Sequence, residues 1–156
     1  MARPHNLVHT CAHSHLRHAG VVVLDWNFCL DMSGGPNWAG NECDSPILVD
    51  SPDAASALPG TVTTFYKQPM YYYFGHVAAF VAPGATRLGV SSSTASYSRD
   101  AASLSSAAFL SPNGEMLVAV VLNRGSRAHE IALRTPNGYV NAHLPPNAIR
   151  TFIVKA

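Results

Sequence analysis

The stretch from Leu24 to Pro46 reads LDWNFCLDMSGGPNWAGNECDSP and says more about the fold than any other part of the chain. It follows the apolar run VVVL at residues 21–24, which is too short for a helix and β-branched enough to predict a buried strand. Acid, aromatic and amide groups come next at Asp25 to Asn27, and a long loop with Gly34 to Pro36 follows. A (β/α)8 barrel presents residues at its active-site face in this way. An aromatic ring beside carboxylate and amide groups suits a sugar.

Composition and charge describe a globular chain and exclude several classes of function. Of the 156 residues, 47% are apolar and 12% are charged, unlike a disordered tail. A net charge of +1 gives no electrostatic footprint for nucleic acid or a membrane surface. Three cysteines form no even disulfide framework. No apolar run approaches the ~20 residues that span a bilayer. We therefore expect no nucleic-acid partner and no transmembrane segment.

Residues 1–20 form a histidine-rich extension that we leave unassigned. They hold five of the eight histidines, together with Cys11. His9 and His13 could share a helix face as zinc ligands, but no cysteine pair or compact four-ligand spacing accompanies them. The segment also lacks the apolar core of about 7 to 15 residues that a secretory signal needs. We expect neither a metal site nor a signal peptide in it.

From Met70 onward the apolar residues recur with the spacing of a helix. Pro69 suits the first turn of a helix, and Pro83-Gly84 stops it. The segment before it, Ser51 to Thr64, reads as a surface insertion because it holds two prolines and several small residues. The pattern predicts an amphipathic helix whose apolar stripe is Met70, Tyr73, Phe74, Val77, Ala78 and Val81.

After Gly84 the chain alternates short apolar runs with turn sequences. Asn113-Gly114 and Asn137-Gly138 favour tight hairpins, because both residue types tolerate a positive φ. Six strands at roughly ten-residue spacing are typical of a β-sandwich. The expected strands are Arg87 to Ser91, Ala107 to Ser111, Met116 to Leu122, Glu130 to Arg134, Tyr139 to His143 and Arg150 to Val154.

Several motifs occur in an order that identifies a family resemblance. Asp25-Trp26-Asn27, then Gly34 to Trp38 with Asn41, then Asp44 to Ile47 stand in one loop region. FYKQPMYY at residues 65–72, Gly75-His76 and VAVVLNR at residues 118–124 follow downstream. Together they resemble the glucosylceramidases, the acid β-glucosidases of glycoside hydrolase family 30, from Val21 to the C-terminus.

The resemblance implies a mostly β chain with some α, divided between two domains. Residues 21–83 would be the C-terminal remnant of a TIM-barrel catalytic domain, and residues 84–156 a β-sandwich domain. A (β/α)8 barrel needs about 200 to 250 residues, so this chain can hold only its last strand–loop–helix unit and the barrel is incomplete. In the family the sandwich is completed by N-terminal strands, and without them a sheet edge stays exposed.

The function implied by the resemblance is that of a retaining β-glucosidase that hydrolyses glucosylceramide to glucose and ceramide in sphingolipid metabolism. Its substrate would be glucosylceramide or another β-glucoside. The resemblance also implies a lysosomal or secreted location and a lipid-presenting activator protein as a partner. It implies no cofactor. Retaining glycosidases need two carboxyl groups about 5 Å apart. In the family both are glutamates on earlier barrel strands, and Glu42, Glu115 and Glu130 match neither. We therefore expect no catalytic residue in this chain and no activity from it alone.

Three residues are carried over as substrate-binding candidates. Trp26 matches the tryptophan that lines the glucose subsite, and Asn41 matches an asparagine of the same loop that contacts the sugar. Asp25 has two readings that stay open: a group that contacts or supports the sugar site, or a buried structural acid at a strand end. Asn37 and Trp38 are expected to shape the loop.

The resemblance breaks after Asn41. The better-known animal enzymes carry apolar residues where this chain has Glu42 and Cys43, at the mouth where the lipid leaves. Two other functions stay open, a stand-alone β-sandwich binding module and a non-functional truncated product. A binding module would need solvent-facing aromatic rings on the sandwich, for which the tail offers Tyr97, Phe109, Tyr139 and Phe152.

Overall fold

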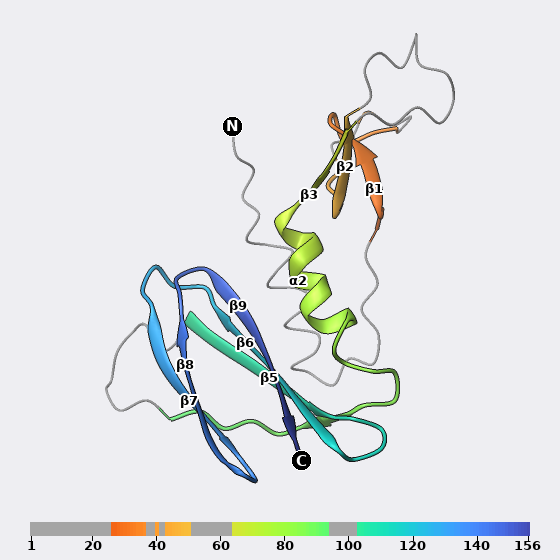
Figure 1. The fold of residues 1–156 in the computed structure, drawn as a ribbon. Helices are drawn as coiled ribbons and strands as arrows, with labels where there is room; N and C mark the ends of the chain where they lie inside the picture. The colour runs from red at the N-terminus through yellow and green to blue at the C-terminus, as the bar shows by residue number, and fades with distance from the viewer. Residues whose placement is uncertain (1–25, 37–39, 41–42, 51–63, 94–102) are drawn as a thin grey trace.

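A computed structural model describes residues 26–36, 40, 43–50, 64–93 and 103–156. This part of the chain is mostly β with one helix, as expected, and closes no barrel (Figure 1). Its elements are β1 (Cys29–Asp31), β2 (Ile47–Asp50), β3 (Thr64–Lys67), α2 (Pro69–Ala78), β4 (Thr86–Leu88), β5 (Leu104–Leu110), β6 (Met116–Asn123), β7 (His129–Thr135), β8 (Gly138–Leu144) and β9 (Ala148–Lys155).

The strands β1 to β3 form a small sheet at one end of the molecule. β1 pairs with β2 in parallel, and β2 pairs with β3 antiparallel. We expected one strand at residues 21–24, then a loop up to the helix. The structure instead places three short strands after that segment, and residues 21–24 lie outside the described part. Of the insertion expected at 51–64, only Thr64 is described, and it begins β3.

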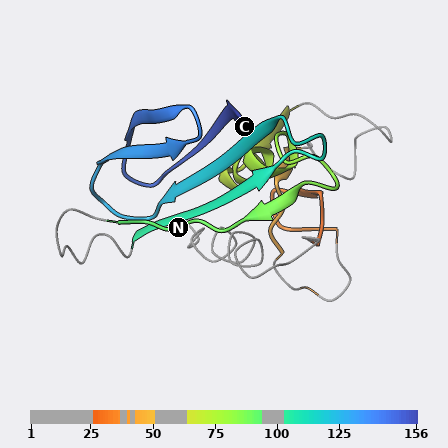
Figure 2. The same cartoon turned by 90° about the horizontal axis from the view of Figure 1, so that it is seen from below.

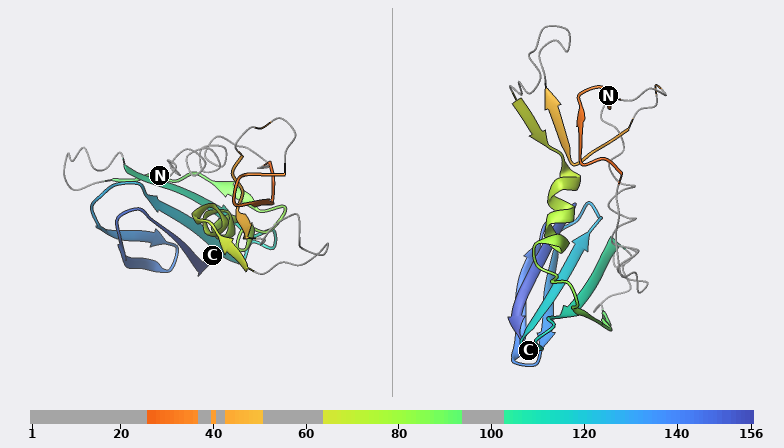
Figure 3. Two further views of the ribbon diagram at one scale, coloured as in Figure 1. Left: turned by 90° about the horizontal axis from the view of Figure 1, so that it is seen from above. Right: turned by 90° about the vertical axis from the view of Figure 1, so that its right-hand side faces the viewer.

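The predicted helix is confirmed as α2, which lies between the small sheet and the sandwich (Figures 1 and 3). Pro69 occupies its first turn, where the missing N–H is not needed. Met70 is buried, whereas Tyr73, Phe74 and Val77 of the apolar stripe are only half-buried and Ala78 is exposed. The helix contacts β3 at one end and β9 along its side, so the apolar stripe is only partly covered in the described structure.

All six strands expected after Gly84 are present as β4 to β9, with boundaries shifted by a few residues. A four-stranded sheet has the order β4-β5-β6-β9, and β7 with β8 forms a separate hairpin that lies beside it (Figure 2). Gly114, in the turn before β6, and Gly138, the first residue of β8, have positive φ angles of 74° and 124°, at the places where Asn-Gly pairs predicted hairpins.

The core of the sandwich is centred on β6, which is buried on both faces from Val118 onward. Thr151 of β9 lies opposite Val120, which lies opposite Ala107 of β5. Directly opposed residues of antiparallel strands share a face. Since Thr151 contacts His76 of α2, this is the face on which the helix packs. Leu144 at the end of the hairpin is fully buried.

Asn123 joins the loops at one end of the sandwich. Its side chain is fully buried and donates to the carbonyl groups of Arg127 (2.7 Å) and Pro145 (2.8 Å). Its Oδ1 accepts the N–H of Gly125 at 2.9 Å. One amide therefore ties the β6–β7 connection to the β8–β9 connection, because it satisfies backbone groups from both.

Replacing this amide is expected to destabilise the chain. Asn123→Ala leaves backbone groups of two loops without partners, which costs about 1–3 kcal/mol in the free energy of unfolding. The matched control is Asn137→Ala, which removes an exposed side-chain bond to the Lys155 carbonyl and should cost less than about 0.5 kcal/mol. Urea unfolding followed by circular dichroism measures the stability of both variants. Equal unfolding midpoints for the two variants would show that Asn123 does not hold the two loops together.

Candidate functional site

The candidate site lies at the small sheet, where the chain enters β1 and leaves it for the β1–β2 loop (residues 32–46). Trp26 precedes β1 and has 81% of its surface exposed, so it is not a core residue in this structure. Phe28, two residues later, is 73% exposed. Asp25 and Asn41 lie outside the described residues, so the structure positions one of the three predicted substrate-binding residues.

The upstream end of the β1–β2 loop is held by the carboxylate of Asp31. Its Oδ1 accepts the Ser33 hydroxyl (2.6 Å), the Ser33 N–H (2.8 Å) and the Gly35 N–H (2.9 Å). The backbone N–H of Asp31 also donates to the Gly35 carbonyl at 2.8 Å. The Ser33 hydroxyl first, and then the Gly35 N–H, lower the pKa of Asp31 below its ordinary value of 3.8. The anchor is therefore ionised at mildly acidic pH.

The downstream end of the loop is held by Gln68, the residue between β3 and α2. Its side-chain amide donates to the Asp44 carboxylate and to the Ser45 carbonyl, the latter at 2.9 Å. Its backbone N–H donates to the Pro46 carbonyl at 2.9 Å. Ser45 is fully buried and donates its hydroxyl to the Ile47 carbonyl. Three consecutive loop residues are thus fixed by the residue that directly precedes the helix.

The two ends of the loop touch each other at Gly34. This residue has a φ of +88°, and a Cβ built on it would lie 2.8 Å from the carbonyl oxygen of Cys43. A side chain at position 34 would therefore meet backbone, which cannot move aside as a flexible side chain can. Glycine is required there by both its φ and the close approach.

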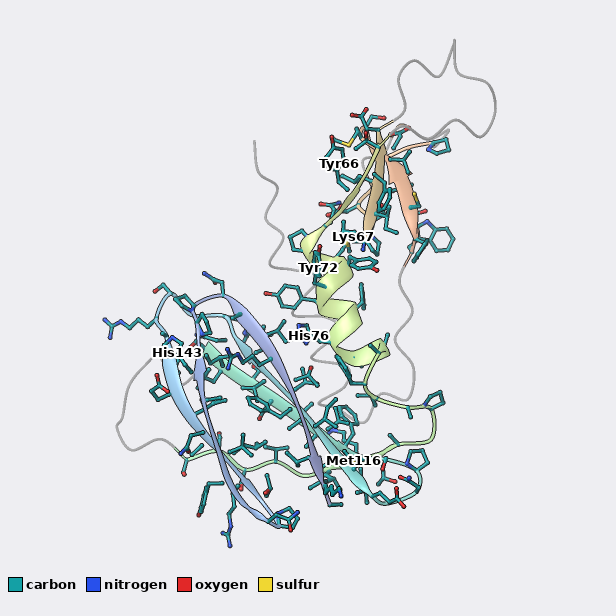
Figure 4. The ribbon with its side chains drawn as sticks, in the orientation of Figure 1. Tyr66, Lys67, Tyr72, His76, Met116 and His143 are labelled. Carbon is teal, nitrogen blue, oxygen red and sulfur yellow. The ribbon has the colours of Figure 1, made fainter. Side chains whose placement is uncertain are left out.

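Four carboxylates of the described residues have structural hydrogen-bond partners. Asp31 and Asp44 accept bonds inside the loop, Glu115 accepts the Asn113 amide in the β5–β6 turn, and Glu130 pairs with His143 across the β7–β8 hairpin. Figure 4 shows His143 on the sandwich, away from Tyr66 and Lys67 of the small sheet. We find no cluster of metal-binding side chains among the described residues. No helix in the same part of the chain is long and apolar enough to cross a membrane.

His76 lies on α2 and points toward the sandwich (Figure 4). Its Nδ1 is 2.9 Å from the hydroxyl of Thr151, and that hydroxyl also lies within hydrogen-bonding distance of the His76 carbonyl. Partial burial lowers the pKa of His76 below its ordinary value of 6.5. The contact fits a packing role for this histidine in preference to a catalytic one.

The contact predicts a pH effect on stability. A histidine whose pKa is lowered by folding favours the folded state when neutral, so its contribution declines as the pH falls below about 6.5. His76→Gln cannot ionise and should show a smaller fall in melting temperature between pH 7 and pH 5. The control is His143→Gln, on the exposed hairpin. Identical pH slopes for wild type and His76→Gln would contradict this account.

Asp31 and Gln68 were not among the residues picked out from the sequence. A faint sign existed in Asp31-x-Ser33, because aspartate commonly accepts hydrogen bonds from the residues that follow it in turns. Gln68 gave no local sign, since its partners lie more than twenty positions earlier in the chain. Only the pairing of β2 with β3 brings them together.

Comparison with known protein families identifies the class of protein to which the chain belongs. The sequence model of the glycosyl hydrolase family 30 TIM-barrel domain matches residues 3–81, and that of the glycosyl hydrolase family 30 beta sandwich domain matches residues 84–152. The chain belongs to glycoside hydrolase family 30, a family of enzymes that hydrolyse glycosidic bonds.

Curated relatives narrow the resemblance within the family. The chain is 39% identical to the lysosomal acid glucosylceramidase of Mus musculus over 130 residues, which cover 83% of this chain and 22% of the mouse protein. It is 35% identical to putative glucosylceramidase 3 of Caenorhabditis elegans over 155 residues, which cover 90% of this chain and 24% of that protein. The chain thus spans about a quarter of the length of these relatives.

Solved structures agree with this assignment. The crystal structure of SrfJ from Salmonella typhimurium aligns with a TM-score of 0.69 and 25% identity, over 100% of this chain and 33% of that one. The endo-beta1,6-glucanase BT3312 aligns with a TM-score of 0.68 over 90% of this chain and 30% of that one. The second is only 18% identical and supports the fold alone.

Proposed function

We propose that this chain is the C-terminal part of a retaining β-glucosidase that hydrolyses glucosylceramide to glucose and ceramide in sphingolipid metabolism. The observation that carries the proposal is Trp26, an exposed indole just before β1 in a chain that is similar to glucosylceramidases. A glucose ring offers an apolar C–H face that stacks on such a ring. Its hydroxyl groups need hydrogen-bonding partners around the rim.

In this proposal Trp26 forms the floor of the glucose subsite, and Asn41 and Asp25 supply polar contacts at its rim. The two catalytic glutamates come from residues of the enzyme outside this chain. The chain alone is then inactive, and a lysosomal or secreted location and a lipid-presenting activator protein belong to the whole enzyme. The mouse relative's name, a lysosomal acid glucosylceramidase, supports the location.

A stand-alone binding module is less well supported by the sandwich surface. Phe109 is buried and Phe152 is half-buried, so neither presents a fully exposed ring face to a ligand. Tyr139 is 69% exposed, but a single exposed ring offers no platform. Tyr97 lies outside the described residues.

The test uses a hybrid enzyme in which residues 21–156 replace the matching part of the mouse enzyme. Trp26→Ala should lower kcat/KM by on the order of 1–3 kcal/mol of transition-state binding, or about 5- to 150-fold. Trp38→Ala, which changes the same residue type within the β1–β2 loop, should cost less. A glucose-shaped inhibitor should lose affinity in the same order. Equal effects of the two substitutions would remove Trp26 from the subsite.

A further inference from the structure

The same tripeptide, proline-asparagine-glycine, occupies the tips of two hairpins, at residues 112–114 between β5 and β6 and at residues 136–138 between β7 and β8. We propose that Asn137 is a site of spontaneous deamidation, and that the hydrogen bonds around Asn113 protect it from the same reaction. The inference concerns the chemistry of the two turns and does not depend on the proposed function.

The reaction needs only the chain and water. The backbone nitrogen of Gly138 gives up its proton and attacks Cγ of Asn137, so that an N–Cγ bond forms and the Cγ–Nδ2 bond breaks. Nδ2 leaves as ammonia, and a cyclic imide remains. Water then opens the imide. Cleavage of the N–Cγ bond yields aspartate, and cleavage of the bond from this nitrogen to the backbone carbonyl carbon of residue 137 yields isoaspartate.

Space and neighbouring sequence do not distinguish the two sites. Asn113 and Asn137 are both exposed, as are the glycines that follow them. Glycine has no side chain to hinder ring closure, and a Cβ built on Gly114 or Gly138 would meet no atom within 4 Å. The preceding residue is a proline in both turns. A difference in reactivity must therefore come from the bonds that hold each asparagine side chain.

Asn113 is held through both polar atoms of its side chain. Its Oδ1 accepts the Ser111 hydroxyl at 2.6 Å and the backbone N–H of Glu115 at 3.2 Å. Its Nδ2 donates to Oε2 of Glu115 at 2.9 Å. Ring closure requires the side-chain amide to rotate and its nitrogen to leave, so these three bonds oppose the reaction.

Asn137 is held through one side-chain bond. Its Nδ2 donates to the Lys155 carbonyl at 3.1 Å, and no other described residue bonds to its Oδ1. Thr135 precedes Asn137 as Ser111 precedes Asn113, but its hydroxyl donates to the Gly138 carbonyl at 3.0 Å instead. The amide of Asn137 is thus freer to reach the geometry that ring closure needs.

Deamidation at Asn137 alters the contact between the β7–β8 hairpin and β9. The donor to the Lys155 carbonyl is lost, and a carboxylate oxygen then faces that carbonyl oxygen. In the isoaspartate product the backbone also runs through Cγ, which lengthens the tip of the hairpin. Either product lowers the formal net charge of the chain from +1 to 0, so the modified protein separates as a more acidic form.

The experiment ages the folded 156-residue chain in neutral buffer, below its melting transition. Mass spectrometry follows the tryptic peptides 100–124 and 135–150, each of which holds one of the tripeptides, and fragmentation locates the modified residue. Asn137 should deamidate at least about 10-fold faster than Asn113, a difference of about 1.4 kcal/mol in activation free energy. Two additional side-chain hydrogen bonds account for an effect of this size.

Unfolding provides the first control. In urea the two sites should react at similar rates, because both have the same proline and glycine neighbours. Equal rates in the folded chain, or a faster reaction at Asn113, would overturn the proposal. A 10-fold difference that persists in urea would also overturn it, since the sequence and not the folded turn would then set the rates.

Substitutions test the protecting bonds directly. Glu115→Ala removes the acceptor of the Asn113 amide and should speed deamidation at Asn113 by about 3- to 10-fold. Glu115→Gln keeps an acceptor oxygen and should retain most of the protection. Glu130→Ala is the matched control, because Glu130 is an exposed glutamate that pairs with His143, and it should leave both rates unchanged. An unchanged rate at Asn113 in Glu115→Ala would show that these bonds do not protect it.

Discussion

The isolated 156-residue chain is expected to release no product from an aryl β-glucoside above a buffer blank. A retaining glycosidase needs an acid/base and a nucleophile about 5 Å apart. The described carboxylates at Asp31, Asp44, Glu115 and Glu130 instead accept hydrogen bonds from loop, turn and hairpin partners. Glu42 lies outside the described residues and stands in no motif of the family's catalytic glutamates. Relative to a complete enzyme, the isolated chain is therefore expected to lose the catalysed rate entirely.

The measurement compares the purified chain with the hybrid enzyme on the same substrate. The hybrid supplies the missing glutamates and should restore turnover, which shows that the assay detects the activity. Turnover by the chain alone that survives purification and disappears on mutation of Asp25 would contradict the account, because a carboxylate of this chain would then be catalytic.

The isolated chain is also expected to expose enough apolar surface to be only marginally stable. Phe28, just before β1, is 73% exposed, Phe65 on β3 is 56% exposed and Tyr72 on α2 is 57% exposed. Large exposed apolar side chains that gather on a surface are normally covered by another part of a protein. We expect strong binding of a dye that reports apolar surface, low solubility, and a melting temperature at or below about 45 °C, the low end for mesophilic domains.

Substitutions locate that surface. Phe65→Thr on β3 should reduce dye binding, since threonine suits a strand and removes an exposed ring. Tyr139→Thr is the control, because Tyr139 is an exposed aromatic on the sandwich and away from the small sheet. A soluble monomer with a cooperative melt above about 65 °C would contradict the expectation. Such a chain would close a complete core, and the binding-module function would gain support.

The sandwich could be predicted from the sequence because its determinants are local. Asn-Gly pairs at 113–114 and 137–138 mark turns whose geometry needs a positive φ, and the apolar runs between turns are long enough to read as strands. The helix was predictable for the same reason, since Pro69 starts it and its apolar spacing is regular. The division of the six strands into a sheet of four and a hairpin of two depends on pairing between distant segments and does not follow from local patterns.

The small sheet could not be predicted in this way. β1 to β3 have three or four residues each, too few to show a period of two, and they stand in a region rich in glycine and proline. The run Ile47-Leu48-Val49 carried a strand preference, but its register against β3 is set by tertiary contacts. For the same reason Gln68 could not be identified, because its bonds join segments that only this register brings together.

The site was predictable only through residues that stand in a recognised motif. Trp26 and Asn41 were found by resemblance, and the exposure of Trp26 adds a physical reason for a ligand to reach it. Asp25 and Asn41 lie outside the described residues, and their roles stay predictions. Asp31 stands outside the motifs, and Gln68 stands within FYKQPMYY without a role assigned to it. The support that both give the loop emerged from their hydrogen bonds.

Glucose release from glucosylceramide by the hybrid enzyme tests the central claim most directly. The claim predicts that residues 21–156 substitute for the matching part of the mouse enzyme and yield a folded hybrid that hydrolyses glucosylceramide. It also predicts that Trp26→Ala lowers kcat/KM of that hybrid by about 5- to 150-fold. A hybrid that folds with a cooperative melt and retains both catalytic glutamates, yet releases no glucose from glucosylceramide, would contradict it.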